Sequence, residues 1–329
     1  MKKFFKWTGI IIGLVLVVIL GIVAYVKLAL PNVGDAPQLK VEVTPERVQR
    51  GEYLANSVAV CIDCHSKRDW TQFSGPLLPG TIGGGGEVFD EKLGFPGTFY
   101  SKNITPYRLK HWSDGEIFRA ITTGVNKEGR AIFPVMPYHN YGKMDKEDIY
   151  SIIAYLRTLP EVKNDVPESQ AAGVFNVILN TIPHPAALTT RPAPSDTIKY
   201  GGYLVQMAAC ADCHTPFEKG QFVEGMEYAG GREFNLPMGT IRTPNLTPHA
   251  TGLAAWDQAT FISRFKMYAG ANYHSPKLGE GDFNTIMPWM MYSRMTESDL
   301  ASIYAYLRTV KPIENKVEKF TPKQQLASR

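Results

Sequence analysis

The sequence predicts a mainly α-helical protein in which two tandem domains follow an amino-terminal membrane-spanning helix. An apolar run from Trp7 to Val26 follows three lysines. A Cys-x-x-Cys-His run occurs twice, at Cys61–His65 and at Cys210–His214. Other segments recur in the same order after each run, which indicates that the second half of the chain repeats the first.

Length and composition are compatible with this organisation. A chain of 329 residues with 44% hydrophobic side chains can supply a core for each of two domains. The formal net charge is only +4, and no cluster of Lys and Arg is interleaved with aromatic residues. The sequence therefore does not predict a nucleic-acid partner.

The Cys-x-x-Cys-His runs are typical of covalent haem attachment. Two thiols at this spacing can each add across one vinyl group of a haem, and the following histidine then serves as the proximal iron ligand. We therefore expect two haem c groups. The expected attachment and ligand residues are Cys61, Cys64, His65, Cys210, Cys213 and His214.

Two other uses of a Cys-x-x-Cys pair agree less well with the sequence. Structural zinc commonly pairs two such knuckles about 15–20 residues apart. Here His65 and His214 are 149 positions apart (214 − 65). A thioredoxin-like pair explains the thiols but gives no reason for a histidine after both. All four cysteines lie in the two runs, so none is left for a disulfide framework.

Residues 1–30 predict an uncleaved membrane anchor. About 20 apolar residues span a bilayer as a helix, whereas a cleaved signal peptide usually has about 7–15 and a small-x-small cleavage site. Three lysines before the run, against Lys27 after it, place the amino terminus in the cytoplasm. We therefore expect a single-pass protein of a bacterial inner membrane, with the haem domains on the periplasmic side.

Residues 31–43 are interpreted as a tether and residues 44–160 as the first haem domain. Thr44 and Pro45 mark the start of a helix that leads to the first Cys-x-x-Cys-His run. A capping box at Ser113 starts a second helix, and Asp145 caps a third. This order, with a haem loop and a methionine loop between the helices, predicts a cytochrome c domain. Four consecutive glycines at 83–86 are interpreted as a flexible surface loop, because no Gly-Lys-Ser/Thr follows.

The same order recurs after a proline-rich linker. Residues 161–194 form this linker, with one short helix expected at its apolar stretch from Val174 to Leu179. Residues 195–312 are interpreted as the second cytochrome c domain and residues 313–329 as a tail. The matching segments are Ser101–Pro106 with Thr243–Pro248 and Ile152–Thr158 with Ile303–Thr309.

The register of the repeat selects the candidate distal ligands. Met136 and Met287 are 151 positions apart (287 − 136), as are Tyr155 and Tyr306 in the last helix of each half (306 − 155). Both methionines precede proline and an aromatic residue. We expect Met136 and Met287 to ligate the two irons, with packing in the core as the alternative. Met144 and Met295 also align, but their position at a helix cap favours packing.

Asn103 and Asn245 are candidates for contacts with the haem propionates. A haem in an apolar pocket leaves its propionates in need of donors, which an amide can supply. The alternative is turn formation before the Thr-Pro pair that follows soon after each asparagine.

Residues 44–312 resemble the bacterial membrane-bound dihaem and trihaem cytochromes c, including the cytochrome subunits of membrane alcohol and gluconate dehydrogenases. The resemblance rests on the two Cys-x-x-Cys-His runs, the two Asn-Ile/Leu-Thr-Pro segments, the two Met-Pro-aromatic segments and the two Ala-Tyr-Leu-Arg-Thr segments. It implies a relay that takes electrons from a dehydrogenase to quinone or an oxidase. The chain differs from those subunits in having two haem motifs rather than three and an amino-terminal anchor.

Histidine and methionine on each iron predict an electron carrier rather than an enzyme. A thioether ligand raises the reduction potential, and six-coordinate iron has no vacant position for a substrate. The alternative is a dihaem cytochrome c peroxidase, which needs one iron that opens to peroxide and an acid–base residue. Glu280 and Asp282 lie near Met287 in the sequence and are the candidates for that residue. A methionine at the same place in both halves favours the carrier.

Overall fold

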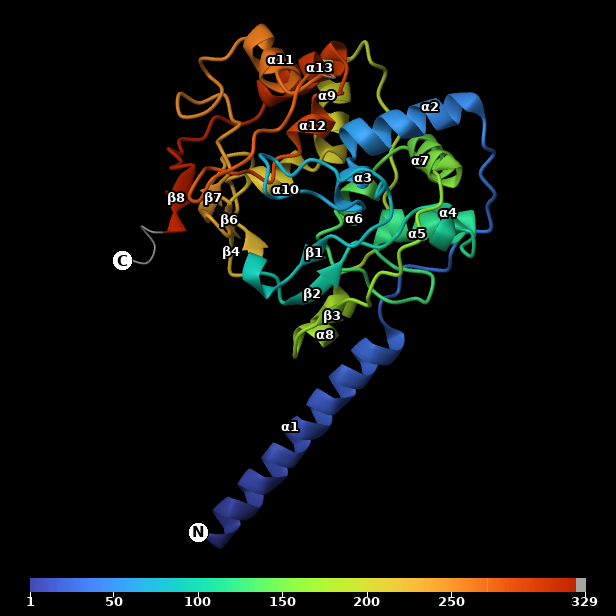
Figure 1. The fold of residues 1–329 in the computed structure, drawn as a ribbon. Coiled ribbons are helices and arrows are strands. Elements are labelled where there is room, and N and C mark those ends of the chain that lie inside the picture. Colours follow the sequence, from blue (N-terminus) through green and yellow to red (C-terminus); the bar gives the residue numbers. More distant parts are fainter. Residues whose placement is uncertain (271, 324–329) are drawn as a thin grey trace.

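A long amino-terminal helix, α1 (Lys2–Ala29), projects from a body that holds the other helices and strands (Figure 1). The computed structural model describes residues 1–270 and 272–323. By length and composition α1 can cross a membrane, and most of its apolar side chains are exposed. An apolar helix that the protein itself leaves uncovered is what a bilayer-spanning segment requires.

The first half of the body is organised around a crossing of two helices. Its helical segments are α2 (Pro45–Tyr53), η1 (Leu54–Val58), α3 (Cys61–Cys64), η2 (Glu91–Leu93), α4 (Pro106–Leu109), α5 (Asp114–Thr123), α6 (Tyr138–Tyr141) and α7 (Lys146–Thr158). Helices α2 and α7 cross at Gly51, where a Cβ atom would lie 1.8 Å from the carbonyl oxygen of Ser151. Only glycine permits this approach.

The second half is organised around the same crossing. Its helices are α9 (Thr197–Met207), α10 (Cys210–His214), α11 (Gln258–Lys266), α12 (Trp289–Tyr292) and α13 (Glu297–Leu307). Helices α9 and α13 cross at Gly201, where a Cβ atom would lie 1.9 Å from the carbonyl oxygen of Ser302. The glycines of the two crossings occupy equivalent positions in the repeat.

Short antiparallel strands fasten the linker and the tail to the two halves. The sheets have the orders β1 (Val88–Phe89), β2 (Gly97–Tyr100), β3 (Gln170–Ala171); β4 (Phe217–Glu218), β5 (Gln221–Phe222); and β6 (Glu233–Leu236), β7 (Gly239–Arg242), β8 (Phe320–Pro322). Strand β3 comes from the linker and β8 from the expected tail. Residues 324–329 of that tail lie outside the described residues.

The expected helix starts are present. The side chain of Thr44 caps α2, Ser113 and Glu116 form a complete capping box on α5, and the side chain of Asp145 caps α7. The short linker helix is present as α8 (Phe175–Ile178), continued by η3 (Leu179–Thr181). These starts were predictable because a cap depends only on residues within one turn.

One apolar core runs through both halves. Fully buried side chains from either half belong to the same cluster, including Leu54, Ile153, Leu204 and Leu300. Met144 and Met295 are also completely buried in it, which confirms the packing role expected for this pair. The two halves therefore pack against each other through buried apolar side chains.

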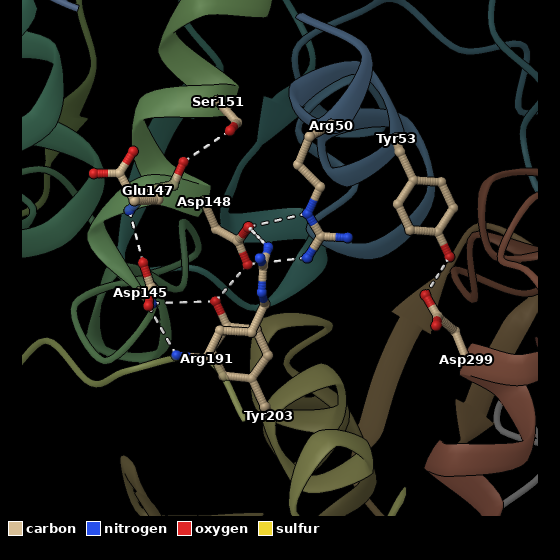
Figure 2. Close-up of polar contacts among 9 residues, drawn as sticks. All are labelled: Arg50, Tyr53, Asp145, Glu147, Asp148, Ser151, Arg191, Tyr203 and Asp299. Carbon is tan, nitrogen blue, oxygen red and sulfur yellow. Dashed lines mark hydrogen bonds and ion pairs between the residues drawn. The ribbon is translucent and has the colours of Figure 1, made fainter. Parts of the chain in front are cut away.

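A buried polar network joins the halves beside this core (Figure 2). Asp148, at the start of α7, accepts hydrogen bonds of 3.0 Å from Arg50 and 2.7 Å from Tyr203 of α9. Arg191 of the linker adds an ion pair of 2.7 Å to the same carboxylate. A buried carboxylate requires such partners, because an unpaired charge is costly in the protein interior.

Candidate functional site

Each Cys-x-x-Cys-His run begins at a strained residue. Val60 and Ala209, directly before the first cysteine of each run, have positive φ angles of 46° and 51°. Neither is glycine, so the left-handed backbone costs free energy that the surrounding fold must offset. This sharp turn ends the preceding helix and starts the short helix that carries both thiols. The same strain at equivalent positions indicates that both runs need this turn.

The two histidines are held by backbone carbonyl groups. Nδ1 of His65 lies 2.6 Å from the carbonyl oxygen of Lys102, and Nδ1 of His214 lies 2.9 Å from that of Pro244. A carbonyl oxygen can only accept, so Nδ1 carries the proton and Nε2 keeps its lone pair. Burial lowers the pKa of His65 and lowers that of His214 to about 4. Both rings are thus neutral imidazoles with Nε2 available for a metal.

The four cysteine side chains are half-buried and make no disulfide. Burial raises the pKa of Cys61, Cys64 and Cys210 to about 12, and that of Cys213 to about 11. The thiols are therefore protonated at neutral pH. Within residues 1–270 and 272–323, no group of three or more His, Cys, Asp or Glu side chains is arranged to hold a metal ion. This donor set fits a haem, whose porphyrin supplies the remaining iron ligands, better than it fits zinc.

The glycine run does not form the flexible surface loop expected from the sequence. Gly83, Gly84 and Gly85 are buried, and the amide of Gly85 donates a 2.8 Å hydrogen bond to the carbonyl of His65. With φ at 70°, a Cβ atom on Gly85 would lie 2.7 Å from the amide of Asn103. Gly230 repeats this contact on His214 at 2.8 Å. The prediction was wrong because the segment that covers these glycines is distant in sequence.

Asn103 and Asn245 form buried turns. The side-chain oxygen of each accepts hydrogen bonds from the backbone and hydroxyl of the threonine two residues on, at 2.7 to 2.9 Å. The amide of Asn103 donates to the carbonyl of Val162 at 2.7 Å, and that of Asn245 to the carbonyl of Ile313 at 2.8 Å. A contact with a haem propionate stays a prediction, and it would require one of these bonds to be exchanged.

The methionine loops are tied to the start of the haem motifs by two tyrosines. The hydroxyl of Tyr141 donates a 2.9 Å hydrogen bond to the carbonyl of Ala59, and that of Tyr292 donates one of 2.8 Å to the carbonyl of Ala208. Met136 and Met287, five residues before these tyrosines, are partly buried against the core. The tyrosines were not among the sequence-predicted site residues, although their separation of 151 positions (292 − 141) matches that of the methionines.

Each candidate site also contacts the other half of the chain. Asp212, inside the second haem motif, accepts a 3.1 Å hydrogen bond from Asn140 and lies 3.1 Å from Nε2 of His139, both on α6 of the first half. In the other direction, Ser74 of the first half donates a 2.6 Å hydrogen bond to the carbonyl of Met287. These contacts bring the first methionine loop beside the second haem motif and hold the second methionine loop.

The acid–base candidates of the peroxidase alternative are placed differently. Glu280 and Asp282 are both exposed. The carboxylate of Asp282 accepts a 2.7 Å hydrogen bond from the amide of Gly279 and so stabilises its own turn. This arrangement gives no support to a catalytic role.

Comparison with known proteins supports a cytochrome assignment. Residues 198–311 match the Cytochrome c family. The chain is 27% identical over 285 residues to the cytochrome c subunit of a quinone alcohol dehydrogenase from Gluconacetobacter polyoxogenes. The aligned region covers 81% of this chain and 56% of that protein. It is 25% identical over 330 residues to the gluconate 2-dehydrogenase cytochrome c subunit of Pantoea cypripedii, covering 95% of this chain and 68% of the relative.

A shorter relative has nearly the same extent as this chain. The diheme cytochrome c-type protein of Cereibacter sphaeroides is 28% identical over 317 residues, or 92% of this chain and 98% of that protein. By contrast, the chain spans little more than half, 56%, of the alcohol dehydrogenase subunit. Residues 198–311 are therefore a cytochrome c domain, and the chain is a relative of the cytochrome c subunits of quinone alcohol and gluconate dehydrogenases.

Proposed function

We propose that the chain is a dihaem electron-transfer protein with one haem c in each of two cytochrome c domains, residues 44–160 and 195–312. The observation that carries the proposal is the repetition of one site geometry outside the matched residues 198–311. A left-handed residue precedes each motif, a carbonyl holds each histidine at Nδ1, and a tyrosine ties each methionine loop. The first half thus has the same local construction as the second.

The residues of each half have complementary roles in this proposal. Cys61 and Cys64, and Cys210 and Cys213, would hold the two haems as thioethers, each formed by adding the S–H group across one vinyl group. His65 and His214 would ligate iron through Nε2, and Met136 and Met287 through sulfur. When bound, each haem supplies an iron that changes between Fe(III) and Fe(II).

The protein contributes orientation and a dry environment. The carbonyls of Lys102 and Pro244 fix the orientation and the tautomer of the histidine rings, so that Nε2 of each ring would be available to hold iron. His214 is buried and His65 is partly buried, which limits the access of water to both rings. A thioether ligand favours Fe(II), and six-coordinate iron leaves no position for peroxide. We therefore propose that the chain transfers electrons and makes or breaks no bond in a substrate.

The partners follow from the relatives and from α1. The relatives are named as subunits of quinone alcohol and gluconate dehydrogenases, which supports a dehydrogenase as electron donor. We propose quinone or an oxidase as the electron acceptor. Helix α1 has the length and composition of a single bilayer span, and its flanking lysines favour haem domains on the periplasmic side of the inner membrane.

Mass spectrometry of the full chain tests this proposal. Protein made in cells that attach c-type haems should carry two haem masses. Changing Cys61 and Cys64 to alanine should remove one haem, and changing Cys210 and Cys213 should remove the other. A parent chain with a single haem, or a Cys61/Cys64 variant of unchanged haem content, would contradict a dihaem protein.

A further inference from the structure

The linker lies against the end of the apolar helix α1. Nζ of Lys27, in the last turn of α1, donates 3.1 Å hydrogen bonds to both the carbonyl and the side-chain oxygen of Asn176 in α8. The side-chain amide of Asn180 in η3 lies 3.4 Å from the carbonyl of Val26. Val26 is also the one buried residue of α1, at 7% exposure. Figure 1 shows α8 at the side of the body from which α1 projects.

The segment that makes these contacts is apolar and exposed. Val174 is 74% exposed and Ile178 is 43% exposed. Val174 directly precedes α8 and Ile178 is its last residue, one helical turn further on, so the two side chains lie on the same side of this segment. No Asp, Glu, Lys or Arg occurs between Glu168 and Arg191, although such residues make up 20% of the chain. An exposed apolar surface without charges is typical of a site that contacts a protein or a membrane.

We propose that α8 and η3 form a second membrane contact, which enters the bilayer interface beside α1 and turns the first half of the body toward the membrane. The bilayer is the occupant because this segment is hydrogen-bonded to the last turn of the membrane-spanning helix. A lysine after an apolar span marks the level of the bilayer surface, and short apolar helical segments at that level insert their side chains into it. The inference rests on the anchor assigned to α1 above.

The contact has a consequence for the first haem site. The ring of Phe175 in α8 packs on Phe133 with centroids 5.7 Å apart, and Phe133 stacks on Phe99 at 3.9 Å. Phe133 lies three residues before Met136 in the same loop. The membrane contact is therefore packed onto the loop that carries the first methionine. The first haem site, rather than the second, is held toward the bilayer.

Fluorescent labels on single introduced cysteines test this arrangement. In the haem-loaded protein the four natural cysteines are occupied, so an added cysteine is the free thiol. The variants are Ile178→Cys in α8, Leu14→Cys in α1 as the lipid-exposed control, and Ile198→Cys in α9 as the water-exposed control. Leu14 is 62% exposed and Ile198 is 47% exposed, so all three positions accept a label. A normal haem spectrum confirms that each variant is folded.

Each labelled full-length protein is reconstituted in phosphatidylcholine vesicles. Quenching by aqueous iodide, by a lipid with a nitroxide near its headgroup and by a lipid with a nitroxide along its acyl chain is measured relative to the same label without quencher. The acyl-chain nitroxide is needed for the label at 14, which lies near the centre of the span. We expect the label at 178 to be quenched by the lipid, and to be quenched by iodide several-fold less than the label at 198. Iodide quenching at 178 equal to that at 198, with the label at 14 still quenched by lipid, would overturn the membrane contact.

Two other outcomes also contradict the inference and are distinguishable. A label at 178 that neither quencher reaches would show a protein partner, such as a second copy of the chain, on this surface. A label at 14 that lipid does not quench would refute the anchor itself. The haem content of the chain would stand in either case, since it is measured independently.

Discussion

The hydroxyl of Tyr53 in the first half donates a hydrogen bond of 2.5 Å to the carboxylate of Asp299 in the second half (Figure 2). The equivalent pair runs in the opposite direction, from Tyr203 to Asp148 at 2.7 Å. Each tyrosine oxygen also accepts a 3.1 Å hydrogen bond from the backbone at the cap of the other half's last helix. The two halves thus exchange the same contacts, as two subunits do across a twofold axis.

The two tyrosines are not expected to be equally important. When Tyr203 is changed to phenylalanine, Asp148 keeps its hydrogen bond from Arg50 and its ion pair with Arg191. For Asp299, Tyr53 is the only side chain of the other half that bonds it within the described residues. Tyr53→Phe should therefore lower the free energy of unfolding by about 1.5–3 kcal/mol, the range for hydrogen bonds to charged groups, and Tyr203→Phe by less. Chemical unfolding measures both, and equal losses would contradict this difference.

Acid should weaken the interface through Asp148. Burial alone would raise its pKa, but the hydrogen bond and charge of Arg50, with Tyr203 and Arg191, hold that pKa below the ordinary 3.8. A lowered pKa means that the carboxylate stabilises the fold fully above the ordinary value. That contribution is lost as the pH falls through the lowered pKa.

The matching variant is Asp148→Asn, which should remove this part of the acid dependence. Glu147→Gln is the control, because Glu147 is half exposed and its ion pair with Arg47 lies at the surface. Thermal unfolding between neutral pH and pH values below the ordinary pKa of Asp148, 3.8, makes the comparison. An Asp148→Asn profile that parallels the parent would argue against this source of acid sensitivity.

Gly85 should tolerate no side chain, although Gly80 should. Both have a positive φ, but a Cβ atom at Gly85 meets backbone atoms at 2.6 Å, whereas nothing lies within 4 Å of one at Gly80. Gly80→Ala should cost about 1 kcal/mol of backbone strain. Gly85→Ala must displace the segment that holds His65, so it should reduce haem attachment at the first site. Haem content per chain is measured for both variants. It should be unchanged in Gly80→Ala and lowered in Gly85→Ala.

Each methionine should close one iron to small ligands. Met136→Ala and Met287→Ala should each convert one haem to a form that binds carbon monoxide rapidly after reduction, while the parent reacts slowly. Met144→Leu and Met295→Leu are matched controls, because these buried methionines pack in the core. Carbon monoxide binding by the controls as fast as by the alanine variants would remove the distinction between ligand and packing methionines.

Local features of the fold were predictable from the sequence and non-local ones were not. The caps at Thr44, Ser113 and Asp145 follow from neighbouring residues, and so does the short helix of the linker. Strands β3 and β8 are too short to show a period, and their partners lie far away in the chain. The burial of the glycines is explained by the segment at Asn103 and by Leu159 and Val162, which pack on them.

The candidate site shows the same limit. The motifs predict which thiols and histidines act together, because they are adjacent in sequence. The carbonyls of Lys102 and Pro244 that hold the histidines lie 37 and 30 residues further on. The register of the repeat pointed to Met136 and Met287, and applying it to Tyr141 and Tyr292 would have indicated their paired role. Their carbonyl partners still required the fold.

Near-infrared magnetic circular dichroism of the oxidised full-length protein tests the central claim most directly. Methionine sulfur bound to ferric haem gives a charge-transfer band whose intensity can be compared with the haem content. We predict a band whose intensity accounts for two haems per chain in the parent. In Met136→Ala and in Met287→Ala the intensity should fall to that of one haem, the haem whose methionine is unchanged. A band that accounts for only one haem in the parent, or high-spin iron in place of the second, would contradict a carrier with two His/Met haems.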